Sequence, residues 1–395
     1  MVPARTPEIE DATARAADAG PRVEVHRDFG SAAAVYAELE PSAPASPFQS
    51  RAWVEAWFGA MDAARGLAPL IVVARGRDGR AEALVAFALR RFGPATVAEL
   101  AGGADANFRM GLFRPGAHLD AGRLRAILRE AARIAGGVDG FALFNVPDSL
   151  DGAAHPLAAL TRADAPRAVP WTRLDPALGA PHYAQADRDA RKKRKRKAER
   201  LAAHGPLDVS RARDAATARA WFDAFLAMRR RRRPPGGDGY DAPAYRRFFE
   251  AACAARADED APPVEIHALR AGPRVAAVLG LARAKGHASG MFLAIDDAPE
   301  VARNSPGEIL VARVVRTLAR EGVASFDLGI GDVRYKRAFC DRTAVLRDGF
   351  EATTARGAAV GAALTALRRA HAALTTRPAA LAAARRLLRG RNPAA

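Results

Sequence analysis

The chain has 395 residues, more than one domain usually holds, so two domains are expected. Hydrophobic residues make up 49% and charged residues 27%, which fits a globular protein with buried cores. Its two cysteines give no disulfide framework and favour a reducing cytoplasm. No stretch is long and apolar enough to predict a membrane-spanning helix. Residues 1–20 lack the apolar region of a signal peptide and are expected to be disordered.

The net charge of +17 is concentrated in three segments. Residues 187–200 carry nine basic and three acidic side chains, residues 229–233 are all arginine, and eight arginines but no acid follow Glu351. A polyanion such as RNA or anionic lipid would therefore bind weakly through these segments. The alternative is that the basic side chains simply form a solvated helix face. No interleaved aromatic residues, helix-turn-helix or zinc pattern accompanies them, so sequence-specific DNA binding is not expected.

The first half of the chain predicts a hairpin, a helix and a strand. Apolar runs on both sides of a Gly/Asp turn predict the hairpin over residues 69–91. Apolar residues at helical spacing predict a helix over 120–134, and FALFNVPD at 141–148 predicts a strand. Trp53 and Trp57 are four residues apart, which favours packing of one helix face over a substrate platform.

The second half repeats this order after a basic connecting segment. Residues 191–205 favour a helix, and a strand at 207–212 and a helix capped by Asp214 follow. A second hairpin is predicted over 264–286, then a strand over 286–296, a helix over 305–322 and a strand over 325–332. The recurrence at an offset of roughly 185 to 195 residues indicates a tandem repeat of one mixed α/β domain. Ala/Leu/Arg helices are expected over 357–389.

The start of the helix at 305 predicts a phosphate-binding site. Ser305 is expected to be the N-cap, with Pro306 at the first helical position and Glu308 completing a capping box. The free N–H groups and positive dipole end of such a helix suit a pyrophosphate, and Gly307 permits close approach of the backbone.

The strand that follows this helix carries the candidate catalytic groups. Asp327 alternates with the apolar residues of SFDLGIGD, and a carboxylate in such a strand is costly to bury unless it is hydrogen-bonded or functional. Asp332, Tyr335 and Lys336 cluster just beyond the strand end, where open α/β sheets bind ligands. The structural alternatives are an arginine partner for Asp327, a turn cap at Asp332, and interface packing of Tyr335 and Lys336.

Three stretches together resemble a known family: SPFQSRAWVEAWF at 46–58, SPGEIL at 305–310, and GVASFDLGIGDVRYKRAF at 322–339. They are similar to the CelD-type acetyltransferases associated with cellulose and exopolysaccharide biosynthesis. That group belongs to the GNAT superfamily and is related to the FemAB-type aminoacyltransferases. The resemblance covers roughly residues 40–345 and implies tandem GNAT-like domains, each with a twisted mixed sheet flanked by helices.

The resemblance also implies a division of the chain and a set of roles. Its domains are a GNAT-like unit at 21–170 and an acetyltransferase unit at 171–350 with the basic linker helix 187–204, followed by a basic helical tail at 351–395. Acetyl-CoA or another acyl-CoA is the expected co-substrate, and an amino sugar, polysaccharide precursor or other small acceptor receives the acyl group. The implied donor-binding residues are Asn304, Ser305, Pro306, Gly307 and Glu308. The implied catalytic residues are Asp327 or Asp332 for the acceptor, Tyr335 as an acid for the thiolate, and Lys336.

Two other functions are consistent with the same residues. A charged tRNA would be the acyl donor in a FemAB-like transferase, and a non-catalytic GNAT-like protein would use its basic segments to bind a membrane or polyanion. His204, His267 and His287 are scattered without metal-ligand spacing, so no metal is expected. Cys340 has no histidine near it in sequence, which argues against a nucleophilic cysteine.

Overall fold

The computed structural model describes residues 22–150, 152–232, 243–254, 262–284, 286–331 and 333–375. The segment predicted to be disordered, Asp332, Arg233 and the tail beyond residue 375 lie outside these ranges. Within the described ranges, no helix is both long and apolar enough to cross a bilayer.

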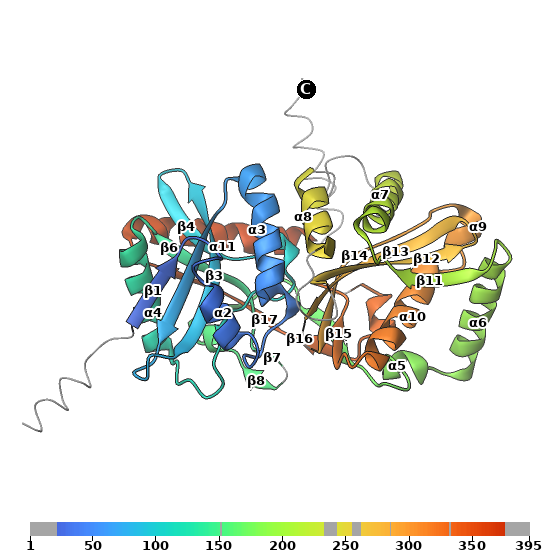
Figure 1. The fold of residues 1–395 in the computed structure, drawn as a ribbon, viewed down its shortest axis with the longest axis horizontal. Helices are drawn as coiled ribbons and strands as arrows, with labels where there is room; N and C mark the ends of the chain where they lie inside the picture. Colours follow the sequence, from blue (N-terminus) through green and yellow to red (C-terminus); the bar gives the residue numbers. More distant parts are fainter. Residues whose placement is uncertain are drawn as a thin grey trace, which may run out of the picture.

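Two mixed sheets lie side by side, each flanked by helices (Figure 1). The first has the order β1-β2-β3-β4-β6-β17-β9, with the short β5 beside β3. Its strands are β1 Arg22–His26, β2 Ala68–Arg75, β3 Ala81–Phe92, β4 Ala95–Leu100, β5 Leu112–Phe113, β6 Gly140–Pro147, β9 Ala163–Asp164 and β17 Leu346–Ala352. A separate small hairpin pairs β7 Ser149–Leu150 with β8 Ala153–Ala154.

The second sheet has the order β11-β12-β13-β14-β15-β10-β16. Its strands are β10 Val169–Arg173, β11 Leu207–Arg211, β12 Val264–Ala271, β13 Arg274–Ala284, β14 His287–Ile295, β15 Ser325–Asp327 and β16 Arg342–Ala344. In both sheets the fourth and fifth strands are parallel and their other neighbours antiparallel. This shared order confirms the predicted tandem of mixed α/β units.

The helices cover these sheets on both faces. They are α2 Ala33–Leu39, α3 Arg51–Arg65, α4 Ala121–Ala135, α5 Pro181–Ala184, α6 Arg188–Ala202, α7 Ala215–Arg232, α8 Pro243–Ala254, α9 Pro299–Ala302, α10 Pro306–Arg320 and α11 Ala355–Thr375. The predicted helices at 120–134, 191–205 and 305–322 are therefore confirmed as α4, α6 and α10. Asp214 caps α7 as expected, since its Oδ1 accepts from the Thr217 N–H at 2.7 Å.

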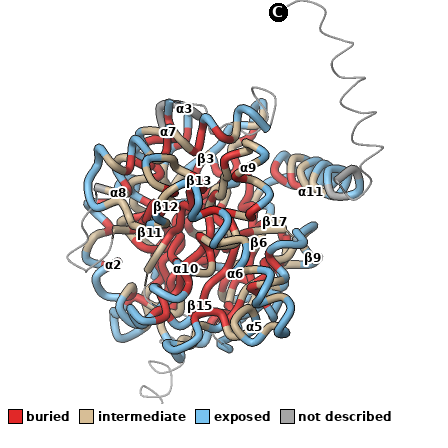
Figure 2. The backbone as a smooth tube through the Cα atoms, turned by 90° about the vertical axis from the view of Figure 1, so that its right-hand side faces the viewer, coloured by how far each residue is buried: buried red, intermediate tan, exposed pale blue. Residues whose placement is uncertain are grey.

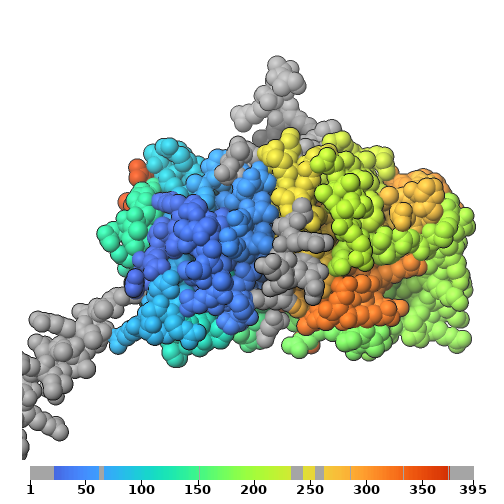
Figure 3. Space-filling view, in the orientation of Figure 1, coloured from blue at the N-terminus to red at the C-terminus, as the bar shows by residue number. Residues whose placement is uncertain are grey.

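One hydrophobic core joins the two halves. Side chains of α2 and α3 from the first half and of α7 and α8 from the second belong to a single buried cluster. Trp53 of α3 meets Phe248 of α8 edge to face, with 5.5 Å between ring centroids. Figure 3 shows these two helices in contact at the junction. Trp53 and Trp57 are fully buried, which confirms the packing interpretation of that pair.

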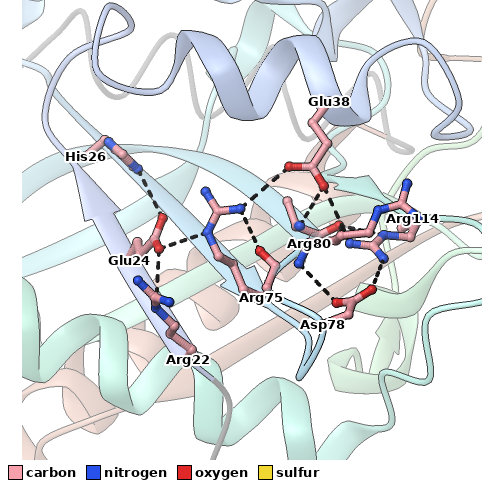
Figure 4. Close-up of polar contacts among 10 residues, drawn as sticks. Arg22, Glu24, His26, Glu38, Arg75, Asp78, Arg80 and Arg114 are labelled. Carbon is pink, nitrogen blue, oxygen red and sulfur yellow. Dashed lines mark hydrogen bonds and ion pairs between the residues drawn. The ribbon is translucent and has the colours of Figure 1, made fainter.

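The outer edge of the first half is held by ion pairs instead. Arg75 of β2 bonds Glu24 of β1 at 2.8 Å and lies 3.6 Å from Glu38 of α2. Arg114 joins Glu38 to Asp78 in the β2–β3 turn (Figure 4). These pairs are partly exposed, so each contributes little alone, and the network mainly fixes the position of α2 over the strand edge.

The sheets exchange strands near the two expected domain boundaries. β10 comes from the end of the first half but lies in the second sheet beside β15. β17 comes from the end of the second half but lies in the first sheet beside β6. Each half therefore needs a strand from the other to complete its sheet. The boundaries at 170 and 350 stay a prediction.

After β17 the chain continues into α11, which packs against β4 and β6 through the cluster of Val97, Ala142, Phe144, Val360 and Leu364. The outward side of α11 is exposed (Figure 2). Its first turn is held by Asp139, which accepts from Thr354 Oγ1 at 2.8 Å and Arg356 Nη2 at 3.0 Å. At Gly357 the contact is so close that a Cβ would lie 1.7 Å from the Asp139 carbonyl oxygen.

We expect Gly357→Ala to lower the free energy of unfolding by about 1–3 kcal/mol, because the methyl group forces α11 away from Asp139. Thermal unfolding followed by circular dichroism measures the change. Gly59→Ala in α3 is the control, since no atom lies within 4 Å of its added Cβ and alanine favours the helix. An unchanged melting temperature for Gly357→Ala would show that α11 is not closely packed at this turn.

Candidate functional site

The two parallel strand pairs have matching registers but different side chains on one face. β4 pairs with β6 as Val97↔Gly140, Ala98↔Phe141 and Glu99↔Ala142; β14 pairs with β15 as His287↔Ser325, Ala288↔Phe326 and Ser289↔Asp327. The middle pair is Ala with Phe in both halves and packs into the core. On the opposite face, apolar Val97, Gly140 and Ala142 correspond to polar His287, Ser325 and Asp327 in the second half.

These three polar side chains form a continuous hydrogen-bonded chain. Asp327 Oδ2 lies 2.9 Å from His287 Nε2, and Ser325 Oγ lies 2.7 Å from His287 Nδ1. An ionised carboxylate only accepts, so Nε2 carries the proton and Nδ1 presents its lone pair to the serine hydroxyl. The arrangement therefore places a base, its orienting carboxylate and a hydroxyl in line.

Asp327 is completely buried, and its remaining oxygen is satisfied by donors from both halves. Oδ1 accepts from the backbone N–H of Gly329 at 2.7 Å and from Asn107 Nδ2 at 3.3 Å. Asn107 lies in the loop after β4, and its Nδ2 also contacts Ser289 Oγ at 2.7 Å and Gly290 O at 3.0 Å. Three donors therefore satisfy the oxygens of this buried carboxylate.

Two cavities meet the chain of polar groups from different sides. The smaller, of about 260 Å³, is lined by His287 and Ser325 together with Phe108, Trp171 and Asp148. The larger, of about 400 Å³, is lined by the same His287 and Ser325 together with Arg173 and residues 43–45 of the first half. A small molecule in either cavity would therefore lie against His287 and Ser325.

A second carboxylate–histidine pair in the same sheet provides a structural comparison. Glu265 Oε2 lies 2.8 Å from His267 Nε2 on β12. Unlike Asp327, Glu265 also bonds Arg211 at 2.8 Å and Arg283 at 2.9 Å. Among the described residues, Asp327 has no arginine or lysine ion-pair partner. Glu265 thus belongs to a structural cluster with two arginines, whereas Asp327 is held by His287, the Gly329 amide and Asn107.

The predicted strand at 325–332 is wrong in its length, since β15 ends at Asp327. Gly329 has a φ of +81°, which turns the chain out of the sheet while its N–H caps the Asp327 carboxylate. Lys336 is buried and donates to the carbonyl oxygens of Gly329 at 2.8 Å and Ile330 at 3.1 Å. It therefore fixes the segment that follows Asp327.

Tyr335 precedes Lys336 at the start of a short 3₁₀ turn, and its side chain is 39% exposed. Burial of its hydroxyl raises the pKa of Tyr335 to about 12, so the phenol is protonated at neutral pH. The fourth expected catalytic residue, Asp332, lies outside the described residues.

The expected donor-binding segment lies at the N-terminus of α10, but the predicted capping box is wrong. Ser305 adopts a left-handed backbone conformation with φ +51° and makes no side-chain cap. Its hydroxyl instead accepts from Lys197 Nζ of α6 at 2.8 Å. The Glu308 carboxylate bonds Arg194 at 3.2 Å and Lys197 at 3.3 Å, because the basic helix α6 packs beside this turn.

These contacts decide how well the segment fits a phosphate group. Pro306 has no N–H, and the amides of Glu308 and Ile309 bond the Ser305 carbonyl oxygen. Asn304 is fully buried, donates to the Glu300 carbonyl oxygen at 2.7 Å and leaves its Oδ1 without a partner. Arg194 and Lys197 supply positive charge at this turn, but both bond the Glu308 carboxylate. A phosphate therefore fits here only when Glu308 releases them.

Sequence reasoning found Asp327 and missed His287, Ser325 and Asn107. The available signal was alternation: His287 and Ser289 share one face of a strand, as do Ser325 and Asp327, each separated by an apolar residue. Which strands are neighbours is not readable from that pattern. Nothing in the sequence indicated Asn107, because its loop is more than 180 residues from Ser289, which it contacts. Among the described residues no cluster of three potential metal ligands occurs.

Comparisons with known proteins agree with this architecture. Residues 188–337 match the family model described as Acetyltransferase (GNAT) domain, the segment that contains α6, β14, α10 and β15. No curated protein is matched by the sequence.

Solved structures are similar in fold. The crystal structure of FemX is similar with a TM-score of 0.56 and 12% identity, covering 84% of this chain and 97% of FemX. A conserved protein of unknown function from Bacteroides thetaiotaomicron has a TM-score of 0.52 and 9% identity, covering 84% of this chain and all of its own. A tandem GNAT protein from the clavulanic acid biosynthesis pathway has a TM-score of 0.45 and 13% identity, covering 84% of this chain and 99% of its own. At these identities the likeness concerns the fold alone.

The Glu265 cluster leads to a pH prediction. Burial raises the pKa of Glu265, but His267, Arg283 and Arg211 lower it further, to about 2. A depressed carboxyl pKa stabilises the fold above the unfolded value near 4.5, and this stability is lost as the pH falls toward 2. We expect Glu265→Gln to reduce the slope of melting temperature against pH between about 5 and 3. Calorimetry across that range tests it, and an unchanged acid slope would contradict it.

Proposed function

We propose that the protein is an acyltransferase that moves an acyl group from a thioester donor of the acyl-CoA type to a small acceptor. The observation that supports it is the buried His287–Asp327 pair, at two cavities, where the matching positions of the first half are the apolar Val97 and Ala142. The GNAT match over residues 188–337 supports the reaction class. The acceptor that we propose is an amino sugar or polysaccharide precursor, as the CelD-type resemblance implies, and the proposed location is a reducing cytoplasm, as the two cysteines favour.

His287 is the proposed general base. Its Nδ1 lone pair faces the Ser325 hydroxyl, and both residues line the cavities, while Asp327 holds the Nε2 proton and stabilises the imidazolium that forms when Nδ1 takes a proton. Amines are protonated near neutral pH, and the Asp148 carboxylate on the wall of the smaller cavity suits such a cation. Arg173 on the larger cavity suits an anionic group of the donor.

The residues after β15 have supporting roles in this proposal. Lys336 positions the Gly329–Ile330 segment and thereby the amide that bonds Asp327. Tyr335 is the proposed acid that protonates a departing thiolate in direct, one-step transfer. It is protonated at neutral pH, but its raised pKa makes it a weaker acid than an ordinary tyrosine. When bound, a CoA donor supplies the activated acyl group.

We expect His287→Ala and Asp327→Asn each to lower kcat by about 10²–10⁴-fold. The first loses the base, and the second no longer favours the required tautomer. Thiol release from acetyl-CoA in the presence of a panel of amines and amino sugars measures the rate. His267→Gln is the matched control, a buried histidine beside a carboxylate in the same sheet, and is expected to keep kcat unchanged. Wild-type rates in His287→Ala would exclude this site from the chemistry.

The donor site has its own test. Glu308 is 26% exposed and occupies Arg194 and Lys197, so Glu308→Gln is expected to tighten CoA binding by about 1 kcal/mol, roughly fivefold in Kd. Isothermal titration calorimetry measures this. Glu321→Gln at the other end of α10 is the control and leaves the affinity unchanged. Equal or weaker binding in Glu308→Gln would show that phosphates do not use this turn.

A charged tRNA is the second candidate donor. It is favoured by the outward side of α6, where Arg191, Lys192, Lys193, Lys195 and Arg196 are exposed beside the N-terminus of α10. Such a patch, like residues 229–232 and α11, also suits weak contact with anionic membrane or RNA. Salt-dependent tRNA binding that weakens on substitution of these side chains, without any CoA turnover, would favour this donor.

A further inference from the structure

We propose that Ser325 is a nucleophile that carries the acyl group as an ester, so that transfer takes place in two steps. The identity of the acyl donor rests on the proposed function; the reactivity of Ser325 does not. The basis is geometric: Ser325 Oγ, His287 and Asp327 stand in the order nucleophile, base and orienting carboxylate, with separations of 2.7 and 2.9 Å.

The backbone at Ser325 is held firmly. The N–H groups of Ala324 and Ser325 both donate to the Gly286 carbonyl oxygen, at 2.8 and 3.0 Å. β15 pairs with β14 on one side and with β10 on the other. The backbone that carries the hydroxyl is therefore fixed beside the imidazole, which favours reaction at this atom.

Ser325 is not required by the fold. The matching residue of the first half is Gly140, where a Cβ would lie 2.5 Å from the Phe350 ring. In the second half β10 places Trp171 opposite Asp327 and Arg173 opposite Ser325, and Ser325 lines both cavities. A hydroxyl has thus been placed where the equivalent position tolerates no side chain at all.

The neighbouring serine on the same face has a different partner. Ser289 is completely buried and bonds Asn107, not a histidine. Ser325, although only 4% exposed, borders the cavity with Asp148 and the cavity with Arg173. Donor and acceptor can therefore lie in different cavities that both border Ser325.

The two steps balance as follows. In the first, Ser325 Oγ forms a bond to the thioester carbonyl carbon, His287 Nδ1 takes the hydroxyl proton, the C–S bond breaks, and that proton passes to the departing sulfur. In the second, the acceptor nitrogen or oxygen bonds the ester carbonyl carbon, and His287 takes the acceptor's proton. The bond from the acyl carbon to Ser325 Oγ then breaks, and His287 returns the proton to that oxygen.

A fluorophosphonate probe tests the nucleophile without any assumption about the donor. We expect intact-mass spectrometry of the full chain to show one adduct that Ser325→Ala removes, and that His287→Ala forms at least about 100-fold more slowly. Ser210→Ala on β11 of the same sheet, whose hydroxyl bonds Asp208, is the control and is expected to label at the wild-type rate. Alanine at 325 is compatible with folding because glycine holds the equivalent place in β6, and circular dichroism verifies the fold.

Acetyl-CoA without acceptor provides the second measurement, quenched in acid to preserve an ester. An acetyl adduct on Ser325 supports the two-step route, and Ser325→Cys, which keeps a nucleophile, is expected to retain an adduct that Ser325→Ala lacks. Acetyl transfer to an acceptor without an adduct, or at the wild-type rate in Ser325→Ala, would overturn the inference and leave the proposed function standing. Probe labelling at Ser325 without acetyl-CoA turnover would support the nucleophile and refute the CoA donor. If the protein shows neither probe labelling nor acetyl-CoA turnover, both the nucleophile and the proposed function are refuted.

Discussion

The burial of one carboxylate, Asp327, is the constraint on which the candidate site depends. An ionised carboxylate removed from water is stable only when donors surround it. The protein supplies them from three places: the imidazole of His287 on the neighbouring strand, the Gly329 amide of its own loop, and Asn107 from the other half. Because Asn107 also bonds Ser289 and Gly290, the first half is fixed against the end of the β14–β15 pair.

The exchange of strands explains why the two halves behave as one structure. β10 completes the second sheet and β17 the first, and the aromatic cluster of α3 and α8 continues the core between them. Removing either strand would leave unpaired backbone groups beside β15 or β6, which is costly in a buried sheet. The loop of residues 106–110 therefore meets the second sheet in a fixed position, and Asn107 and Phe108 can form part of a site whose other members come from distant sequence.

Local patterns predicted the elements well, and long-range pairing limited what they could say of the site. Both hairpins, α10 and the repeat followed from apolar periodicity and turn residues, because these properties depend on neighbours in sequence. Asp327 was recognisable because a carboxylate interrupts an apolar strand. Its partner His287 is 40 residues away, and nothing local distinguishes it from the buried structural His267. The Ser305–Glu308 capping box failed for the same reason, since Arg194 and Lys197 of α6 compete for both side chains.

The exchange of β10 and β17 between the sheets also accounts for the two cavities that border His287. In the first sheet β17 continues directly into α11, whose Val360 and Leu364 cover the face formed by Val97 and Ala142. In the second sheet the equivalent strand is β10, which continues through α5 into α6, beside α10 and on the opposite side of the sheet. No described helix therefore covers His287, and the loop with Phe108 together with residues 43–45 covers it only in part, which leaves the two cavities. A polar chain of Ser325, His287 and Asp327 is tolerable on that buried face because each member has a hydrogen-bond partner. The face under α11 is apolar because Val360 and Leu364 of this helix would offer no hydrogen bond to a polar group there.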